Sequence, residues 1–266
     1  MSFYHKKKYG QNFLNNELEI LNKIIEVSEV GNEDSILEIG PGQGALSSML
    51  VDRVKNLICV EIDRDLEKPL QKKFSNKKNF KLIMADILEL DLREYLTKNT
   101  KVVANIPYYI TSPIINKIIE HRDLIDEAYL MVQKEVGERI CAKKGRERSI
   151  LTLAVEYYGE ASYLFTIPRR HFKPIPNVDS AFIKIKLDRE NKYKKIMNEA
   201  VFFKYIKAAF SNKRKNIVNN LSTLGFKKDF IKEVLKGLNI PESERAENIG
   251  IDDFIELIKA FEIKKN

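Results

Sequence analysis

The 266-residue chain contains few of the side chains that build covalent crosslinks and metal sites. It has two cysteines, Cys59 and Cys141, and three histidines that are scattered along the sequence. Two lone thiols provide neither a disulfide framework nor the spacing of a zinc site, a pattern that is typical of a reducing cytosol. We therefore expect a cytoplasmic protein whose chemistry uses no metal ion.

Long apolar runs are also missing. No run approaches the length of a membrane span, and the cluster Lys6, Lys7 and Lys8 is not followed by the apolar core of a signal peptide. Hydrophobic residues still make up 44% of the chain, enough for a large core, and the formal net charge is +8. This charge favours nucleic acid as a partner over an anionic membrane surface, although a general enrichment in lysine would explain part of it. We expect no membrane partner.

Apolar, β-branched runs alternate with helical periods over residues 1–188. The predicted strands are 35–39, 57–60, 80–84, 101–105, 128–132, 163–167 and 181–187. This alternation predicts an α/β fold with a doubly wound, mostly parallel, Rossmann-like sheet. The last run alternates apolar residues with Lys184 and Lys186, which predicts an edge strand with one exposed face. Helical periods dominate residues 189–266, where we predict a second, all-helical domain.

Four residues that suit ligand binding lie at the carboxyl ends of four successive predicted strands: Gly40, Glu61, Asp86 and Asn105. In an open parallel sheet, ligands bind outside the carboxyl ends of the strands, so we expect these residues at one crevice. Glu61 lies about 20 residues after the glycine-rich loop, the usual distance for a carboxylate that binds both ribose hydroxyls. Asp86 can accept a hydrogen bond from an adenine amino group.

The glycine-rich loop after the first of these strands holds three glycines, Gly40, Gly42 and Gly44. Glycines let the backbone approach a ligand, and a predicted helix N-terminus follows. The third glycine comes one residue earlier than in dinucleotide-binding loops, and the loop contains a proline. This pattern favours a nucleoside cofactor without a pyrophosphate, and we predict S-adenosylmethionine. Taken alone, the loop could also be a plain tight turn.

The stretch from Asn105 to Tyr108 suits the exocyclic amine of a planar base, which is a poor nucleophile because its lone pair is delocalised. The side-chain oxygen of Asn105 and a backbone carbonyl of Ile106 or Pro107 could accept its two N–H bonds and free the lone pair. Tyr108 could stack on the ring, and Pro107 would hold the turn rigid. The alternative is an ordinary Asn-x-Pro turn at the end of a strand.

These motifs recur together in one known family. The shared segments are KKYGQNFL (7–14), LEIGPGQGAL (37–46), EIDRDL (61–66), NIPY (105–108), MVQKEV (131–136), FKPIPNVDSA (172–181) and AFSNKRK (209–215). With them the chain resembles the ribosomal RNA adenine N6,N6-dimethyltransferases, in particular the bacterial small-subunit enzymes. The match runs nearly from end to end. One departure is Tyr109, where the bacterial family usually has asparagine.

The resemblance implies a role for each matching site residue. Asn12 and Leu14 would line the methionine end of the cofactor, with Gly40 under its tail, Glu61 on the ribose and Asp86 on the adenine. Asn105 and Tyr108 would take the target base, and Asn105 would also border the cofactor. Phe172 would close on the base from the other side. The alternative for Phe172 is a packing role within the proline-rich loop.

The resemblance also implies the reaction and the partner. The family transfers two methyl groups to each of two adjacent adenines in a hairpin near the 3′ end of 16S rRNA, late in small-subunit assembly. We expect a monomer that holds this RNA with Lys6–Lys8 and with a basic helix carrying Lys213, Arg214 and Lys215. A merely solvated lysine-rich face is the alternative for that helix.

Two other functions stay open. One is the macrolide-resistance methyltransferase of 23S rRNA, a sister enzyme that shares the core motifs. The other is an RNA-binding assembly factor that keeps the fold without catalysis. The intact Asn105, Pro107 and Tyr108 count against a pure binding protein, which has no use for amine polarisation. We therefore predict a methyltransferase domain over residues 1–188 and an RNA-binding domain over residues 189–266.

Overall fold

The computed structural model describes residues 13–14, 18–145 and 148–265, and the chain forms two compact units. The first, here called the sheet unit, extends to Gly137 and resumes at Glu160–Arg189. The second, the helical unit, comprises Glu138–Gly159 and the chain from Glu190 onward.

This division differs from the sequence-based one, which placed residues 138–159 in the first domain. The helix α6 (Ile150–Tyr158) belongs to the helical unit because its aromatic side chains pack there. The ring of Tyr157 stacks on Phe202 with centroids 4.5 Å apart, and Tyr158 stacks on Phe203 at 5.9 Å. The later crossing between the units, after Arg189, lies next to the predicted boundary.

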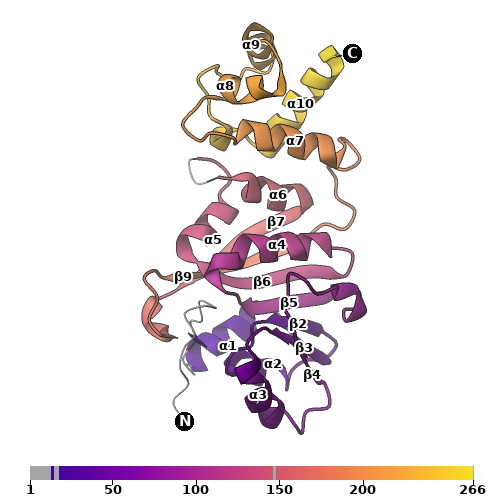
Figure 1. Ribbon diagram of the computed structural model, residues 1–266, viewed down its shortest axis with the longest axis vertical. Helices are drawn as coiled ribbons and strands as arrows, with labels where there is room; N and C mark the ends of the chain where they lie inside the picture. The colour runs from indigo at the N-terminus through magenta and orange to yellow at the C-terminus, as the bar shows by residue number, and fades with distance from the viewer. Residues whose placement is uncertain (1–12, 15–17, 146–147, 266) are drawn as a thin grey trace. The chain divides into compact units, whose positions relative to one another are not determined.

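A seven-stranded sheet organises the sheet unit (Figure 1), in the order β4-β3-β2-β5-β6-β9-β7. Its strands are β2 (Ser35–Ile39), β3 (Asn56–Glu61), β4 (Phe80–Met84), β5 (Thr100–Asn105), β6 (Ile125–Gln133), β7 (Gly159–Ile167) and β9 (Ser180–Leu187). From β4 to β6 the neighbouring strands are parallel, and β9 pairs antiparallel with β6. The mostly parallel, Rossmann-like sheet predicted from the sequence is confirmed. The strand order reverses direction between β2 and β5, where such folds bind their ligands.

Helices bury the two faces of this sheet. They are α1 (Leu18–Val27), α2 (Ala45–Leu50), α3 (Glu67–Lys73), α4 (Thr111–Glu120) and α5 (Lys134–Cys141), which leads into the helical unit. Apolar side chains of α1, α2 and α3 form one core with strand residues such as Ile36 and Val103. The helix α4 packs against β6 (Figure 1) and buries isoleucines at helical spacing, among them Ile114 and Ile118.

The strand β9 corrects the predicted edge strand. It lies between β6 and β7, so both of its sides are paired within the sheet. The lysine alternation misled because Lys184 meets a partner on the neighbouring strand. Its Nζ lies 2.8 Å from Oε1 of Glu127, and both side chains are mostly buried. Lys184 therefore does not mark a solvent-exposed edge, because its charge is balanced by Glu127 on the neighbouring strand.

A second, two-stranded sheet joins the beginning of the described chain to the proline-rich loop. The strand β1 (Phe13–Leu14) pairs antiparallel with β8 (Phe172–Lys173), and Leu14 lies opposite Phe172. Both Leu14 and Phe172 are buried in the core shared with α1 to α3. This pairing fixes one end of the loop that leads into β9.

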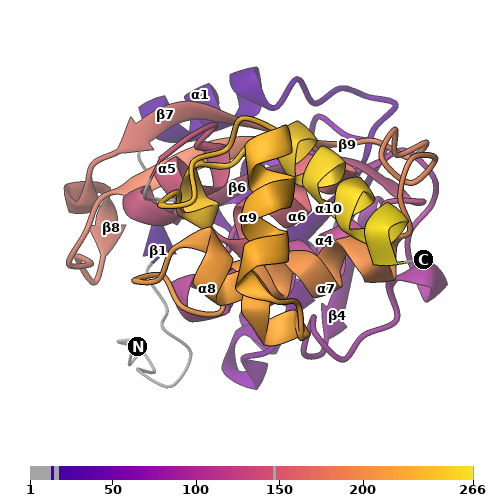
Figure 2. The same ribbon diagram turned by 90° about the horizontal axis from the view of Figure 1, so that it is seen from above.

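In its described residues, the helical unit combines α6 with further α-helices. These are α7 (Glu199–Ala209), α8 (Ile217–Leu221), α9 (Lys228–Gly237) and α10 (Ile251–Lys265). Figure 2 shows α9 and α10 side by side. The ring of Phe261 on α10 packs against Phe230 on α9 and against Phe226, which lies just before α9. In the described part of the chain, no helix is long and apolar enough to cross a membrane.

Lys213, Arg214 and Lys215 do not lie on a helix, which corrects another prediction. The helix α7 ends at Ala209 and α8 begins at Ile217, so Lys213, Arg214 and Lys215 lie on the connecting loop. All three are exposed. We call residues Ser211–Asn216 the basic loop.

Candidate active site

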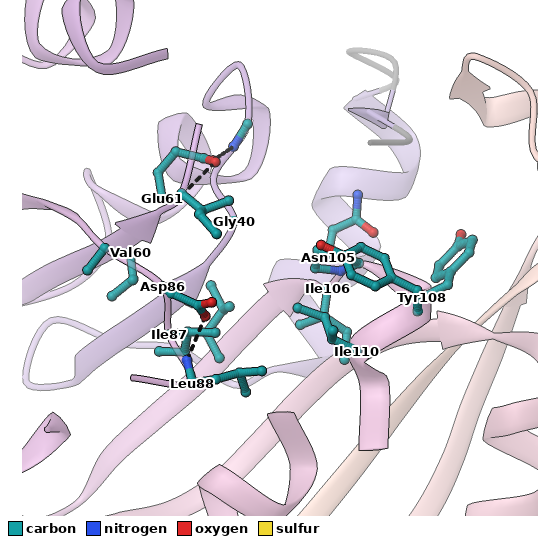
Figure 3. A pocket seen from close by; sticks show the side chains of 16 residues that line it. Gly40, Val60, Glu61, Asp86, Ile87, Leu88, Asn105, Ile106, Tyr108 and Ile110 are labelled. Atoms are coloured by element: carbon teal, nitrogen blue, oxygen red, sulfur yellow. Dashed lines mark hydrogen bonds between the residues drawn. The ribbon is translucent and has the colours of Figure 1, made fainter. Parts of the chain in front are cut away.

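A pocket lies at the carboxyl ends of β2, β3, β4 and β5 in the sheet unit. Its volume is about 930 Å³ when its open mouth is included. Figure 3 shows Gly40 and Glu61 on one side of it and Asn105, Ile106 and Tyr108 on the other. The lining residues are Ile39, Gly40, Gly42, Val60, Glu61, Ile62, Ala85, Asp86, Ile87, Leu88, Asn105, Ile106, Pro107, Tyr108, Tyr109 and Ile110. The residues that follow the four predicted strand ends therefore meet in one pocket.

The loop between β2 and α2, residues Gly40–Gly44, is here called the glycine loop. Gly40, Gly42 and Gly44 have φ values of 70°, 57° and 74°, a left-handed conformation that strains other residues. Their N–H groups all donate within the protein. Gly40 donates to Val60 O at 2.9 Å, Gly44 to Pro41 O at 2.8 Å, and Gly42 to a carboxylate oxygen of Glu61 at 3.1 Å.

Glu61 is fixed at the end of β3 by three backbone N–H groups. Besides Gly42, Ile62 and Asp63 donate to its Oε1 at 3.0 and 2.9 Å. Burial raises the pKa of Glu61, and these three hydrogen bonds act in the opposite direction. The carboxylate is therefore held in one orientation at the pocket wall, and its remaining lone pairs can accept from a ligand.

Two ionisable residues, Lys73 and Glu38, lie next to the glycine loop. Lys73, at the end of α3, donates from Nζ to the carbonyls of Gln43 and Gly44 at 3.0 and 2.9 Å. Glu38 is buried in β2 just before the loop and accepts a hydrogen bond from Cys59 Sγ at 3.4 Å. Burial raises the pKa of Glu38 to about 7. Sequence reasoning missed both residues, although a glutamate between Leu37 and Ile39 in an apolar strand was a usable signal.

Asp86 follows β4 and lies in the middle of the pocket wall (Figure 3). Its Oδ1 accepts the N–H of Leu88 at 2.9 Å, which turns the carboxylate into the pocket. The neighbouring Ile87 and Leu88 also line the pocket, so a flat apolar surface surrounds one polar acceptor. This combination suits a purine ring with an amino group.

The stretch from Asn105 to Tyr108 forms the opposite wall. Asn105 ends β5, opposite Met131 of β6, and Pro107 begins the short 3-10 helix η4 (Tyr108–Ile110). The carbonyl of Pro107 accepts the N–H of Ile110 at 3.2 Å, while Ile106 and Pro107 both line the pocket. The Tyr108 hydroxyl lies 2.6 Å from Ser180 Oγ, and burial raises the pKa of Tyr108.

Other predicted site residues lie away from this pocket or outside the described residues. Gly44 is the N-cap of α2, and a Cβ there would come within about 3.0 Å of the Phe74 ring, so its contact is with α3. Leu14 and Phe172 are core residues, and Phe172 is only 1% exposed. Asn12, Lys6, Lys7 and Lys8 lie outside the described residues. The packing alternative for Phe172 matches its position here.

The basic loop of the helical unit is held by asparagines. The buried Asn220 of α8 donates from Nδ2 to Ala209 O at 2.6 Å and to Asn212 O at 3.0 Å. Asn212 Oδ1 accepts from Arg214 N, and Asn216 Oδ1 caps α8 by accepting from Asn219 N, both at 3.0 Å. Neutral amides thus fix the loop backbone and leave its three cationic side chains exposed.

Comparison with known proteins identifies the family. A family model described as ribosomal RNA adenine dimethylase matches residues 2–262. The chain belongs to this family. The protein is therefore a methyltransferase, and its mostly parallel sheet is of the Rossmann-like methyltransferase type. In the described residues, no group of three or more histidine, cysteine, aspartate or glutamate side chains could hold a metal ion.

Individual relatives agree over almost the whole chain. Ribosomal RNA small subunit methyltransferase A of Fusobacterium nucleatum is 72% identical over 262 residues, which cover 98% of this chain and 99% of that protein. The crystal structure of a dimethyladenosine transferase from Plasmodium falciparum is 29% identical, with a TM-score of 0.78, over 95% of this chain and 98% of that one. The crystal structure of 23S rRNA methyltransferase ErmE is 25% identical, with a TM-score of 0.74, over 94% of this chain and 100% of that one.

Proposed function

We propose that the protein transfers methyl groups from S-adenosylmethionine to the N6 amines of two adjacent adenines near the 3′ end of 16S rRNA, late in small-subunit assembly. The observation that carries this proposal is the shared pocket, which has Glu61 and Asp86 on one side and the Asn105–Tyr108 wall on the other. One side suits a nucleoside and the other suits an amine-bearing base.

The glycine loop supports S-adenosylmethionine over a dinucleotide. A pyrophosphate needs free backbone N–H groups at such a loop. Here the N–H groups of Gly40, Gly42 and Gly44 all donate within the protein, and the acceptor for Gly42 is the carboxylate of Glu61. That carboxylate would repel a phosphate but can accept two ribose hydroxyls. When bound, S-adenosylmethionine supplies an electrophilic methyl group on its sulfonium.

The Asn105 wall would prepare the amine for attack. We assign its two N–H bonds to the side-chain oxygen of Asn105 and the carbonyl of Ile106, because the Pro107 carbonyl already accepts from Ile110. Two acceptors in these positions favour a tetrahedral nitrogen whose lone pair faces the methyl group. Tyr108 would stack on the base, which must first leave the RNA helix to reach the pocket.

The choice of small-subunit RNA rests on the similarity to ribosomal RNA small subunit methyltransferase A and on the basic loop. A pocket that grips one base supplies little affinity, so phosphate contacts must supply most of it. Lys213, Arg214 and Lys215 are exposed on a fixed backbone and suit that role. We expect Lys6, Lys7 and Lys8 to add to it.

The test is methyl transfer from labelled cofactor to small and large ribosomal subunits that lack the modification. We expect transfer to small subunits, and transfer to large subunits alone would favour the 23S enzyme instead. Binding of the cofactor without transfer to either would favour the non-catalytic assembly factor.

The same assay tests the amine acceptor. Replacing Asn105 with alanine should raise the barrier to methyl transfer by roughly 2–4 kcal/mol, the scale for a preorganised polar group, and change cofactor affinity much less. Asn56→Ala is the matched control, because Asn56 begins β3 at the amino ends of the parallel strands and does not line the pocket. Near-normal turnover in Asn105→Ala would contradict the role given to the whole wall.

A further inference from the structure

Ser180 lies in no part of the reaction described so far, yet it contacts a pocket residue directly. We propose that Ser180 is a positioning residue that fixes the ring of Tyr108 and, through it, the plane of the target adenine. This inference rests on the proposed function, because it concerns how that site aligns its base.

The contact joins the hydroxyl of a buried serine to that of a partly buried tyrosine. Tyr108 Oη and Ser180 Oγ lie 2.6 Å apart, at the short end of the range for such hydrogen bonds. Ser180 is fully buried at 0% exposure, and the Tyr108 side chain is partly buried. If either hydroxyl were removed, the other would lose this hydrogen bond away from bulk water. The free-energy cost of that loss favours the paired arrangement.

The Ser180 side of the contact is rigid because its backbone lies inside the sheet. Ser180 begins β9 opposite Gln133 of β6, and the preceding carbonyl, of Asp179, accepts the N–H of Lys134 at 2.9 Å. The same strand β6 holds Asn105 through its pairing with Met131. One strand therefore fixes both the amine acceptor and the anchor of the stacking ring.

The ring of Tyr108 can rotate about its side-chain bonds, and the hydrogen bond to Ser180 restricts that rotation. The backbone of Tyr108 lies in the one-turn helix η4, and a tyrosine ring can still rotate about its two side-chain bonds. A hydrogen bond at the outer end of the ring holds the ring against that rotation. Transfer requires the amine to lie in line with the methyl group, and small misalignments slow such reactions strongly. Loss of the anchor should therefore lower kcat and leave KM for the RNA almost unchanged, because phosphate contacts set that affinity.

The experiment is a double-mutant cycle on the full chain, with Tyr108→Phe, Ser180→Ala and the double variant. Each single variant should lower kcat by about 5- to 20-fold, with KM for the subunit and Kd for S-adenosylmethionine changed by less than about twofold. Because both substitutions remove the same hydrogen bond, the double variant should be about as slow as the slower single one. The assay uses whichever ribosomal subunit the wild type methylates, so an error in that assignment does not affect the result.

A buried serine elsewhere provides the control for stability. Ser28 is fully buried and donates to Ile24 O at 2.6 Å at the end of α1, and it does not line the pocket. Ser28→Ala should lower the melting temperature with kcat unchanged. If Ser180→Ala behaves in the same way, the contact is structural and the proposal is wrong. If the two single effects multiply in the double variant, the residues act independently and the proposal is also wrong. A wild type that methylates neither subunit would overturn the proposed function and this inference together.

Discussion

The glycine loop and the basic loop are both irregular connections whose backbones are held by hydrogen bonds, but different chemical groups make those bonds. Each connects two regular elements, and polar side chains hold the backbone of each. The glycine loop is held by ionisable groups, Glu61 and Lys73, with the buried Glu38 behind it. The basic loop is held by the neutral amides of Asn212, Asn216 and Asn220.

The two loops also present different things to a ligand. The glycine loop turns its N–H groups inward and offers bare backbone beside the Glu61 carboxylate, so its charges lie within the site. The basic loop offers exposed cationic side chains on a fixed backbone. We infer that the first loop selects a cofactor by shape, whereas the second attracts a polyanion of any local shape. Changes to the two loops should therefore affect different measurements.

The largest expected effect separates the two ligands. Reversing Lys213, Arg214 and Lys215 to glutamate should weaken binding to small subunits by roughly 4 kcal/mol and reduce the salt dependence by up to about one unit of slope per lost phosphate contact. Binding of S-adenosylmethionine in calorimetry should not change. The control reverses Lys192, Lys194 and Lys195, which are also exposed in the helical unit and change the net charge equally. Equal losses in both triple variants would show that net charge, and not the basic loop, attracts the RNA.

The second effect concerns pH, to which the ionisable groups around the glycine loop should respond and the amides that hold the basic loop should not. Because burial raises the pKa of Glu38 from 4.5 to about 7, the folded state retains a proton that the unfolded state has lost. The free energy of unfolding should therefore fall by about 3 kcal/mol as the pH rises from 4.5 through 7. Glu38→Gln should remove this contribution, which denaturant titrations at several pH values can measure. The exposed Glu33 provides the control Glu33→Gln, and a similar pH profile for wild type and Glu38→Gln would contradict the assignment.

The third effect should appear in the helical unit alone. Asn220→Ala removes one buried and one partly buried hydrogen bond and should cost about 2 kcal/mol of stability at any pH between 5 and 8, because amides do not titrate there. It should weaken subunit binding and leave cofactor binding intact. Asn219→Ala, which removes bonds nearer the surface, should cost less than about 1 kcal/mol. Loss of cofactor binding in Asn220→Ala would show that the two loops are coupled.

How much of this could be predicted from the sequence differs between the loops. The meeting of Gly40, Glu61, Asp86 and Asn105 at one pocket could be predicted because a parallel sheet places successive carboxyl ends at one edge, whatever the packing details. The basic loop was assigned to a helix because Phe203, Ile206 and Phe210 continue a helical period up to it. Asn212 and Asn216 were the contrary signal, since asparagine side chains compete with helical hydrogen bonding.

The position of Ser180 could not be predicted, because it depends on strand order. Nothing local to residues 180–187 shows that β9 inserts between β6 and β7, and the Lys184–Glu127 pair that permits it joins distant parts of the chain. Phe172 shows the same limit. Its loop looks exposed in sequence, yet the pairing of β8 with β1 buries the ring in the core.

The smallest expected effect tests whether the glycine loop needs its cationic support. Lys73→Met keeps the length of the side chain but removes the Nζ donor to the carbonyls of Gln43 and Gly44. Those bonds are largely exposed, so their loss should weaken S-adenosylmethionine binding by only about 1 kcal/mol, or about fivefold in Kd. The adjacent Lys72, also exposed at the end of α3, provides the control Lys72→Met with the same charge change. If both variants bind the cofactor equally well, the hydrogen bond from Gly42 N–H to Glu61 and the left-handed glycines hold the loop without Lys73. Glu61 would then be the side chain that holds the glycine loop as the asparagines hold the basic loop.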